Sequence, residues 1–507
     1  MKYLNINRKL ILSIFSIFLI GLIHIPSPLF GDQAFFLLGA KEMNEGLVLY
    51  QDFWDIKQPG IFIFYLAAGK AFGFTAIGIH IFELCYWLCF SILLVWFLRK
   101  FNYFKYDILT YLAPLMIVGT YYSNSSVQSL TQVEALVSFP ILLVLIFNKL
   151  YIESNKRKML WLFLSGVAGG LVVFFKFIFA PILIAFWIGI LISNIRNHVS
   201  YTKIAVNILI ISAGVITFWI PFGLYCYHHN IVQLCYYTFI KLPPLVLEYG
   251  KIKSFHHLFN SIYYFFSKIS FLLILSFISI IYIRKKPILI NLWLWLVLGI
   301  IVILLQKNSW YTYHFQLLYL PVVLLALYTS DRIIEKLQLF KFLIKLKLNF
   351  IIAFFLLLIN GFTFFILSGK INKLHQYNYA ISAGNRIAYW NSNIDNERAY
   401  RVSQYLNSLD QKRCSIFVVN DPLIYYYTQR NQATAQSGWS MQLFVPGQLE
   451  ILFKELVNTV PCYIFIRREF LPYFETRGIE IYSWMKKNYI ISNSSSDGIW
   501  YKSNSNL

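Results

Sequence analysis

Five carboxylates crowd one short stretch near the start of the chain. Residues 1–330 contain ten acidic side chains, and five of them fall within 24 residues. These five are Asp32, Glu42, Glu45, Asp52 and Asp55, and Lys57 follows them directly. Carboxylates and ammonium groups are the side chains that move protons and hold anions. Aromatic residues and proline bracket the stretch, which indicates a membrane surface, where a charge is costly unless it is used.

The local pattern leaves two interpretations of Asp32. In one it is only the N-cap of an amphipathic interfacial helix over residues 33–45, which Gly46 ends. In the other it is a functional carboxylate, held at a fixed depth by the apolar run before it. We favour function for Asp32, Asp52, Asp55 and Lys57, and a solvated loop position for Glu42 and Glu45. Residues 59–73 are predicted to form a second short piece, either interfacial or re-entrant, before the next span.

The composition fixes the class of protein. Of the 507 residues 58% are hydrophobic and 13% are charged, and the mean hydropathy is +0.60. This excludes a soluble enzyme, a disordered chain and a disulfide-stapled secreted module. A spanning helix needs about 20 apolar residues. Eleven runs qualify: 9–30, 76–98, 107–123, 131–151, 159–175, 177–195, 204–225, 266–283, 288–305, 313–330 and 349–368.

The basic residues predict the orientation. The net charge is +22, but the lysines and arginines cluster between apolar runs, which is typical of loops that face anionic lipid and not of a nucleic-acid surface. With the N-terminus in the cytoplasm, alternating spans place 20 basic residues inside and six outside. The predicted location is the inner (plasma) membrane. No nucleic-acid partner is expected.

The chain divides in two by composition. Residues 1–369 are predicted to form the membrane domain, with outer loops at 31–75 and 226–265. Residues 370–507 are polar and mixed, and an odd number of spans leaves them outside. Strand patterns at Cys414–Val419 and Cys462–Ile466, a helix over Leu449–Val457 and a closing hairpin near Ser496-Asp497-Gly498 predict a small α/β domain.

The first outer loop resembles that of the GT-C superfamily of polytopic glycosyltransferases. The resemblance is to the bacterial branch that is similar to the dolichyl-phosphate-mannose–protein mannosyltransferases, family 39. In that family an Asp-Glu pair follows the first span, and a Gly-x-x-x-Tyr-x-Asp-x-Trp-Asp-x-Lys-Pro-Pro-Gly run comes later. The matching residues are Gly46, Tyr50, Asp52, Trp54, Asp55, Lys57, Pro59 and Gly60. Gln33 stands in place of the Glu, and Gln58 in place of the first Pro.

Weaker matches extend the resemblance along the chain. Thr131-Gln132-Val133-Glu134 resembles the family's acidic position in the second outer loop. A Gly-rich span that ends in Lys176 and the Tyr313-His314-Phe315 run also resemble family motifs. Each of these has a simpler reading: Glu134 as an interfacial residue, Lys176 as a snorkelling cation and His314 as part of an aromatic belt.

The resemblance implies a fold and a reaction. The expected fold is mainly α, a polytopic bundle of about 11 spans of GT-C type with interfacial helices and a small extracytoplasmic α/β domain. The expected donor is a sugar, hexosyl or pentosyl, on a polyprenyl phosphate, and the acceptor is a lipid, a glycan or a protein. Asp32 would be the general base. Asp52, Asp55, Lys57, Glu134, Lys176 and His314 would bind substrate. No metal ligand is assigned, and a divalent metal stays open as a cofactor.

Two rival functions stay open. A transporter or flippase of lipid-linked glycans would place ionisable groups within its spans. The spans contain very few, of which Glu83 is the clearest, and Glu83 could pair within the bundle. A non-catalytic membrane scaffold is the second rival, because Gln33 departs from the family pattern.

Overall fold

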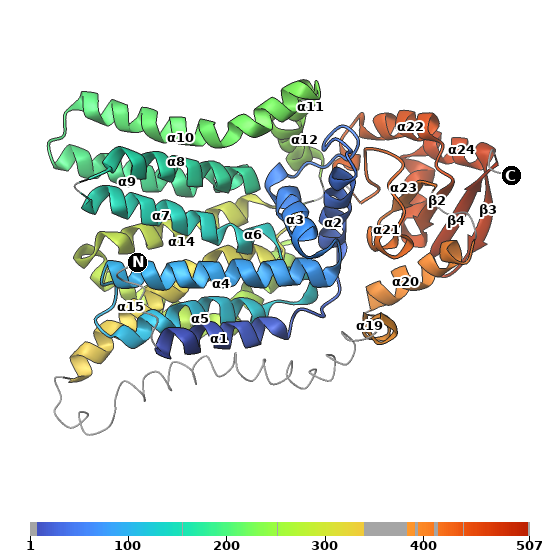
Figure 1. Ribbon diagram of the computed structural model, residues 1–507. Coiled ribbons are helices and arrows are strands. Elements are labelled where there is room, and N and C mark those ends of the chain that lie inside the picture. Colours follow the sequence, from blue (N-terminus) through green and yellow to red (C-terminus); the bar gives the residue numbers. More distant parts are fainter. Residues whose placement is uncertain are drawn as a thin grey trace. The chain divides into compact units, whose positions relative to one another are not determined.

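The computed structural model describes residues 8–154, 156–250, 252–338, 383–390, 394–409, 414–439 and 441–504 (Figure 1). The chain forms two compact units. The first, the helical bundle, comprises the described parts of 1–25, 80–221 and 252–375. The second, the loop–sheet unit, comprises the described parts of 26–79, 222–251 and 376–507.

Long apolar helices build the helical bundle. Eight helices in the described ranges are long and apolar enough to cross a membrane. The chain is therefore a multi-pass membrane protein. The α-helices of the bundle, including those that are not counted among these eight, are α1 (Arg8–Leu22), α4 (Ala76–Lys100), α5 (Asp107–Asn124), α6 (Val133–Leu136), α7 (Ser138–Glu153), α8 (Lys158–Phe175), α9 (Ala180–Arg196), α10 (Tyr201–His228), α13 (Phe255–Ile278), α14 (Pro287–Leu305) and α15 (Tyr319–Gln338).

Eight of the eleven predicted spans match these helices closely, and two more match with one end shifted. The predicted span 9–30 is too long, since α1 ends at Leu22 and a turn leads to Pro26. Pro26 and Pro28 lack the backbone N–H that would continue the helix. The predicted span 266–283 begins too late, because Ser254 caps α13 by accepting a hydrogen bond from His257 N. The predicted span 349–368 lies outside the described residues.

Glycines allow two spans of the bundle to touch backbone to backbone. A Cβ atom at Gly166 of α8 would lie 2.2 Å from the carbonyl oxygen of Ile211 in α10. A Cβ atom at Gly214 of α10 would lie 2.2 Å from the carbonyl oxygen of Phe163 in α8. In lipid, helix association depends on such close packing of small residues. Close packing of α8 against α10 therefore explains why glycine is needed at this point of α8.

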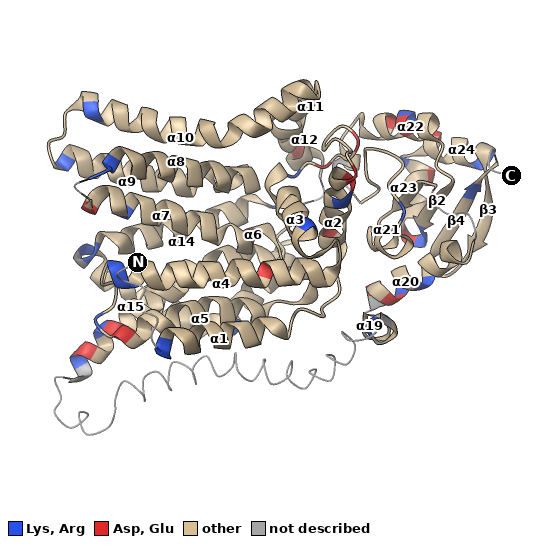
Figure 2. Ribbon diagram, viewed as in Figure 1, with Lys and Arg blue, Asp and Glu red and all other residues tan. Residues whose placement is uncertain are grey.

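One end of the helical bundle gathers most of its basic side chains (Figure 2). Lys9 Nζ lies 3.5 Å from an Asp107 oxygen. Lys286 Nζ donates to the carbonyl oxygens of Asn102 and Tyr103 at 3.0 and 2.8 Å. The first contact joins the start of α1 to the start of α5, and the other two join the start of α14 to the loop between α4 and α5. The clustering agrees with the charge pattern from which the orientation was predicted.

The loop–sheet unit contains a four-stranded sheet in the order β1-β2-β4-β3. β1 and β2 are parallel, and the other two pairs are antiparallel. The strands are β1 (Ile416–Val419), β2 (Tyr463–Arg467), β3 (Tyr489–Ser494) and β4 (Gly498–Ser503). The two predicted strands and the predicted hairpin are confirmed.

Short helices complete this unit. Leu452 of α22 and Met485 of α24 pack with Phe417 and Ile464 of the sheet in one apolar core. The helices are α2 (Gly31–Asn44), α3 (Pro59–Phe72), α11 (Val232–Tyr236), the π-helical turn η3 (Tyr237–Lys241), α12 (Leu242–Tyr249), α19 (Ala383–Trp390), α20 (Ile394–Asn407), α21 (Leu423–Thr428), α22 (Gln448–Thr459), α23 (Leu471–Thr476) and α24 (Ile479–Asn488). The predicted helix over Leu449–Val457 is confirmed as α22.

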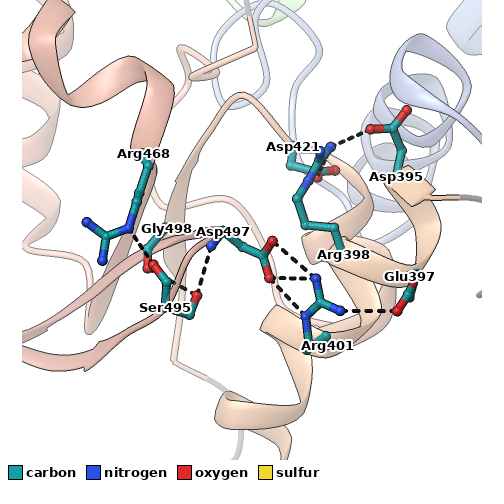
Figure 3. A network of polar contacts seen from close by, with 9 residues as sticks. All are labelled: Asp395, Glu397, Arg398, Arg401, Asp421, Arg468, Ser495, Asp497 and Gly498. Carbon is teal, nitrogen blue, oxygen red and sulfur yellow. Dashed lines mark hydrogen bonds and ion pairs between the residues drawn. The ribbon is translucent and has the colours of Figure 1, made fainter.

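Arginines of α20 tie that helix to the sheet (Figure 3). The Arg401 guanidinium donates to both carboxylate oxygens of Asp497, at 2.9 and 3.1 Å. Asp497 lies in the β3–β4 turn, so the contact joins α20 to the hairpin. Arg398 donates to Asp395 at 2.6 Å and to Asp421 at 3.4 Å. Burial raises the pKa of Asp421 to about 6, although the Arg398 charge opposes that shift.

Candidate active site

The Asp32 carboxylate lies in the first turn of α2, not at its N-cap. The helix begins at Gly31, with Phe30 as the cap residue. The Phe30 N–H donates to Oε1 of Gln33 at 2.8 Å, and the Gln33 N–H donates to the Phe30 carbonyl at 2.8 Å. The prediction that Asp32 caps this helix is therefore wrong, because Gln33 satisfies the cap backbone. The Asp32 carboxylate is left for other contacts.

Two groups contact the Asp32 carboxylate, one through a hydrogen bond and one through an ion pair. Trp439 Nε1 donates to Asp32 Oδ1 at 2.9 Å, and Lys57 Nζ lies 3.8 Å from the same oxygen. The side chain of Asp32 is 24% exposed and that of Lys57 is 31% exposed. Both groups are thus partly buried and still reachable from solvent, as a reacting pair must be.

Lys57 also holds the Asp55 carboxylate. Lys57 Nζ lies 3.0 Å from Asp55 Oδ2, and the Ile56 N–H donates to Asp55 Oδ1 at 2.7 Å. Asp55 is almost fully buried. Burial raises the pKa of Asp55, and the Lys57 charge opposes that rise. One ammonium group therefore stands between two carboxylates of the first loop.

The Asp52 side chain turns back into its own loop. Its Oδ2 accepts a hydrogen bond from the Val48 N–H at 2.8 Å. Tyr50, which has a φ of 76°, donates its hydroxyl to the carbonyl of Lys57 at 2.8 Å. The structure thus brings Asp32, Asp55 and Lys57 together, and it uses Asp52 to shape the turn before them.

Glu42 differs from its expected position as a solvated loop residue. It is buried, and its Oε1 accepts a hydrogen bond from the Gln432 N–H at 3.0 Å. Burial raises the pKa of Glu42 to about 8, and the Gln432 hydrogen bond only partly offsets this. Glu42 therefore belongs to the packing of α2 and not to a solvated face.

A second cluster lies in the helical bundle around α6, at the end opposite the one that gathers most of the basic side chains (Figure 2). Lys176 Nζ lies 2.7 Å from Glu134 Oε1 and donates to Gln306 Oε1 at 2.7 Å. His314 Nε2 lies 3.7 Å from the same Glu134 oxygen. Glu134 and His314 are each 2% exposed. The structure brings together all three residues that the sequence predicted here, and it adds Gln306.

The ends of helices position these side chains. α8 ends where Lys176 takes an extended backbone with φ −167°, and α14 ends just before Gln306. Thr131 has a φ of 52°, which a non-glycine residue rarely adopts. Its N–H donates to Glu83 Oε1 at 3.0 Å. The buried Glu83 thus pairs within the bundle, as expected, and fixes the loop that leads to Glu134.

Sequence reasoning missed two of the residues that complete the clusters. Gln306 ends an apolar helix and has no motif around it. Trp439 lies 407 residues from Asp32 in the chain, and no local pattern joins the two. In the part of the chain that the structure describes, no group of three or more His, Cys, Asp or Glu could hold a metal ion.

Comparison with solved structures identifies the fold. ArnT from Cupriavidus metallidurans bound to undecaprenyl phosphate matches with a TM-score of 0.63 and 10% identity, over 97% of each chain. The oligosaccharyltransferase AglB from Archaeoglobus fulgidus, in complex with an inhibitory peptide and a dolichol-phosphate, matches with a TM-score of 0.50 and 13% identity. That match covers 98% of this chain and 74% of AglB.

The chain has the GT-C fold. ArnT and AglB are both GT-C membrane glycosyltransferases. A further AglB structure, tethered to an acceptor peptide, matches with a TM-score of 0.51 and 13% identity over 99% of this chain and 75% of AglB. No family model matches the sequence, and no curated protein matches it. The expected fold class is thus confirmed, while the narrower family 39 resemblance stays a prediction.

Proposed function

We propose that the chain is an integral membrane glycosyltransferase that takes a sugar from a polyprenyl-phosphate donor. The GT-C fold supports the reaction class. The observation that carries the proposal is the Asp32–Lys57–Asp55 group in the loop that follows the first helix. A carboxylate there can act as general base on the acceptor hydroxyl, while an adjacent ammonium group can hold an anion. The acceptor would be a lipid, a glycan or a protein.

The donor phosphate needs cations or oriented donors as negative charge develops on it. Lys57 supplies one cation in the loop–sheet unit. In the helical bundle, Lys176 and His314 flank Glu134, and Gln306 adds an amide. ArnT is bound to undecaprenyl phosphate and AglB to a dolichol-phosphate in their solved structures. Those two ligands support a polyprenyl phosphate as the lipid carrier here.

The membrane arrangement in this proposal follows the charge pattern. The basic end of the helical bundle would face the cytoplasm, and residues 370–507 would lie on the outer side of the inner membrane. The Glu134 cluster is at the opposite end of the bundle from the basic side chains, so it would lie at the outer surface. The mannosyltransferase-like assignment within family 39 rests on the first-loop motif alone.

The two rival functions have less support. A transporter would use an intramembrane ionisable group that can change partners. Glu83 instead is fixed by the Thr131 N–H and by the hydroxyl of Tyr121. The scaffold interpretation rested on Gln33, yet that residue is fully buried and satisfies the backbone at the start of α2. Its departure from the family pattern therefore has a structural use.

Purified protein in lipid nanodiscs tests the proposal. The donor is a polyprenyl-phosphate sugar fraction, and the acceptor is supplied by an envelope fraction, both prepared from cells that lack the gene. The readout is loss of the lipid-linked sugar by mass spectrometry. Asp32→Asn should abolish the consumption. Glu45→Gln is the matched control, because Glu45 is an exposed carboxylate of the same segment and contacts Asn431 and Lys41 but not Asp32. Equal activity of both variants would reject Asp32 as the base.

A further inference from the structure

The segment that carries Trp439 runs along the edge of β1. The Ala433 N–H donates to the Ile416 carbonyl at 2.9 Å, and the Asn420 N–H donates to the Gly438 carbonyl at 3.2 Å. Gly438 fits so tightly that a Cβ atom there would lie 2.4 Å from the Val418 carbonyl oxygen. The sheet therefore fixes the backbone on which Trp439 stands.

The indole of Trp439 packs on the first residue of α2. A Cβ atom at Gly31 would lie 3.0 Å from Cζ2 of Trp439, and Gly31 has a φ of 39°, which favours glycine. The glycine lets the indole approach the start of the helix. From this position its Nε1 donates to Asp32 Oδ1 at 2.9 Å.

The two groups that contact the Asp32 carboxylate approach the same oxygen. Trp439 Nε1 and Lys57 Nζ approach Oδ1. Among the described residues, no hydrogen bond or ion pair engages Oδ2. A carboxylate whose one oxygen is fixed keeps its other oxygen at a defined position.

We propose that Trp439 is a positioning residue for the general base. Its indole N–H holds the Asp32 carboxylate with Oδ2 available to the acceptor hydroxyl. The α/β domain thereby takes part in the acid–base step and does more than cover the site. This inference rests on the proposed function, in which Asp32 removes the proton of the acceptor.

The test is Trp439→Phe, which keeps the ring and removes the N–H. Loss of a hydrogen bond to a charged group should lower kcat roughly tenfold. The donor KM should stay unchanged. In the Asp32→Asn background the same substitution should have no further effect.

Trp390→Phe is the matched control. Trp390 is a tryptophan of the same unit, and its Nε1 donates to the Pro26 carbonyl at 3.0 Å rather than to Asp32. Trp390→Phe should leave kcat and the donor KM as they are. If Asp32→Asn abolishes turnover but the two Phe variants behave alike, the proposal for Trp439 is overturned and the proposed function stands. If Asp32→Asn is fully active, the proposed function itself has failed.

A spectroscopic measurement covers the case in which Trp439→Phe does not fold. In protein labelled with ¹⁵N at the indole positions, Asp32→Asn should shift one indole N–H resonance upfield, because the hydrogen bond loses its charged acceptor. Glu45→Gln should shift none. A spectrum unchanged by Asp32→Asn would overturn the proposal.

Discussion

Lys176 and Glu134, 42 residues apart, form an ion pair of 2.7 Å at the end of the helical bundle opposite its basic side chains. The side chain of Glu134 is 2% exposed, while that of Lys176 is 29% exposed. The carboxylate is thus the anchored partner and the ammonium group the accessible one. A lysine held in this way can bind an anion without leaving the buried carboxylate uncompensated.

Lys176→Gln should therefore weaken donor binding more than it lowers turnover. Loss of a charged hydrogen bond costs about 1.5–3 kcal/mol, so the donor KM should rise roughly ten- to a hundredfold. Steady-state kinetics with a polyprenyl-phosphate sugar measures it. Lys149→Gln is the control, because Lys149 pairs with the exposed Glu153 at the basic end. An unchanged KM for Lys176→Gln would remove Lys176 from the donor site.

The stability of the loop–sheet unit should depend on pH through Glu42. Its pKa is raised from 4.5 to about 8 by burial, so the folded state holds a proton that the unfolded chain releases. The stability from this proton is complete below pH 4.5 and is lost as the pH rises through about 8.

Glu42→Gln mimics the protonated acid and isolates this effect. The melting temperature of Glu42→Gln minus that of the wild type should grow between pH 5 and pH 8 and then level off, given the pKa of about 8. Glu45→Gln on the same loop should show a constant difference. A constant difference for Glu42→Gln would mean that Glu42 is ionised throughout this range.

The contact between α8 and α10 predicts a large effect of a single methyl group. Gly166→Ala would place Cβ 2.2 Å from a backbone oxygen that cannot move aside. Overpacking of this kind costs about 1–3 kcal/mol. The melting temperature of the purified protein should fall. Gly189→Ala is the control in α9, because its nearest atom would be 3.7 Å away. Equal melting temperatures of the two variants would contradict the close helix contact.

The proposed orientation can be read from two surface positions. Ile479 in the loop–sheet unit is 58% exposed, and Tyr201 at the start of α10 is 83% exposed. Each is changed to cysteine in a variant whose six native cysteines are replaced. A membrane-impermeant maleimide should label position 479 in spheroplasts with an intact inner membrane. It should label position 201 only after permeabilisation. The reverse pattern would invert the topology.

The features predicted best from the sequence are those that neighbouring residues determine, such as helix ends and short strands. Pro59 opens α3 and Gly73 follows its end, as the prediction for residues 59–73 required. The strands of the α/β domain were found from their apolar runs. The start of α2 was predicted wrongly, because the side chain of Gln33, which satisfies the cap backbone, was not recognised as a helix signal.

Tertiary contacts decide what the sequence could not predict. The carboxylates of Asp32 and Asp55 and the ammonium of Lys57 are near in sequence, so their meeting was foreseeable. The docking of Trp439 on Gly31 depends on how its segment follows β1, and no spacing encodes that. The division of the chain into 1–369 and 370–507 stays a prediction. The loop–sheet unit joins residues 26–79 and 222–251 to the α/β domain.

The most direct measurement is mass spectrometry of polyprenyl-linked sugars in membranes of three strains: the intact strain, a deletion of this gene, and the deletion complemented with Asp32→Asn. We predict that a polyprenyl-phosphate sugar accumulates both in the deletion strain and in the strain complemented with Asp32→Asn. Its mass then identifies the sugar that the enzyme transfers. If the deletion strain and the Asp32→Asn strain both have the lipid profile of the intact strain, and the variant is present at normal level in the membrane, the proposed function is contradicted.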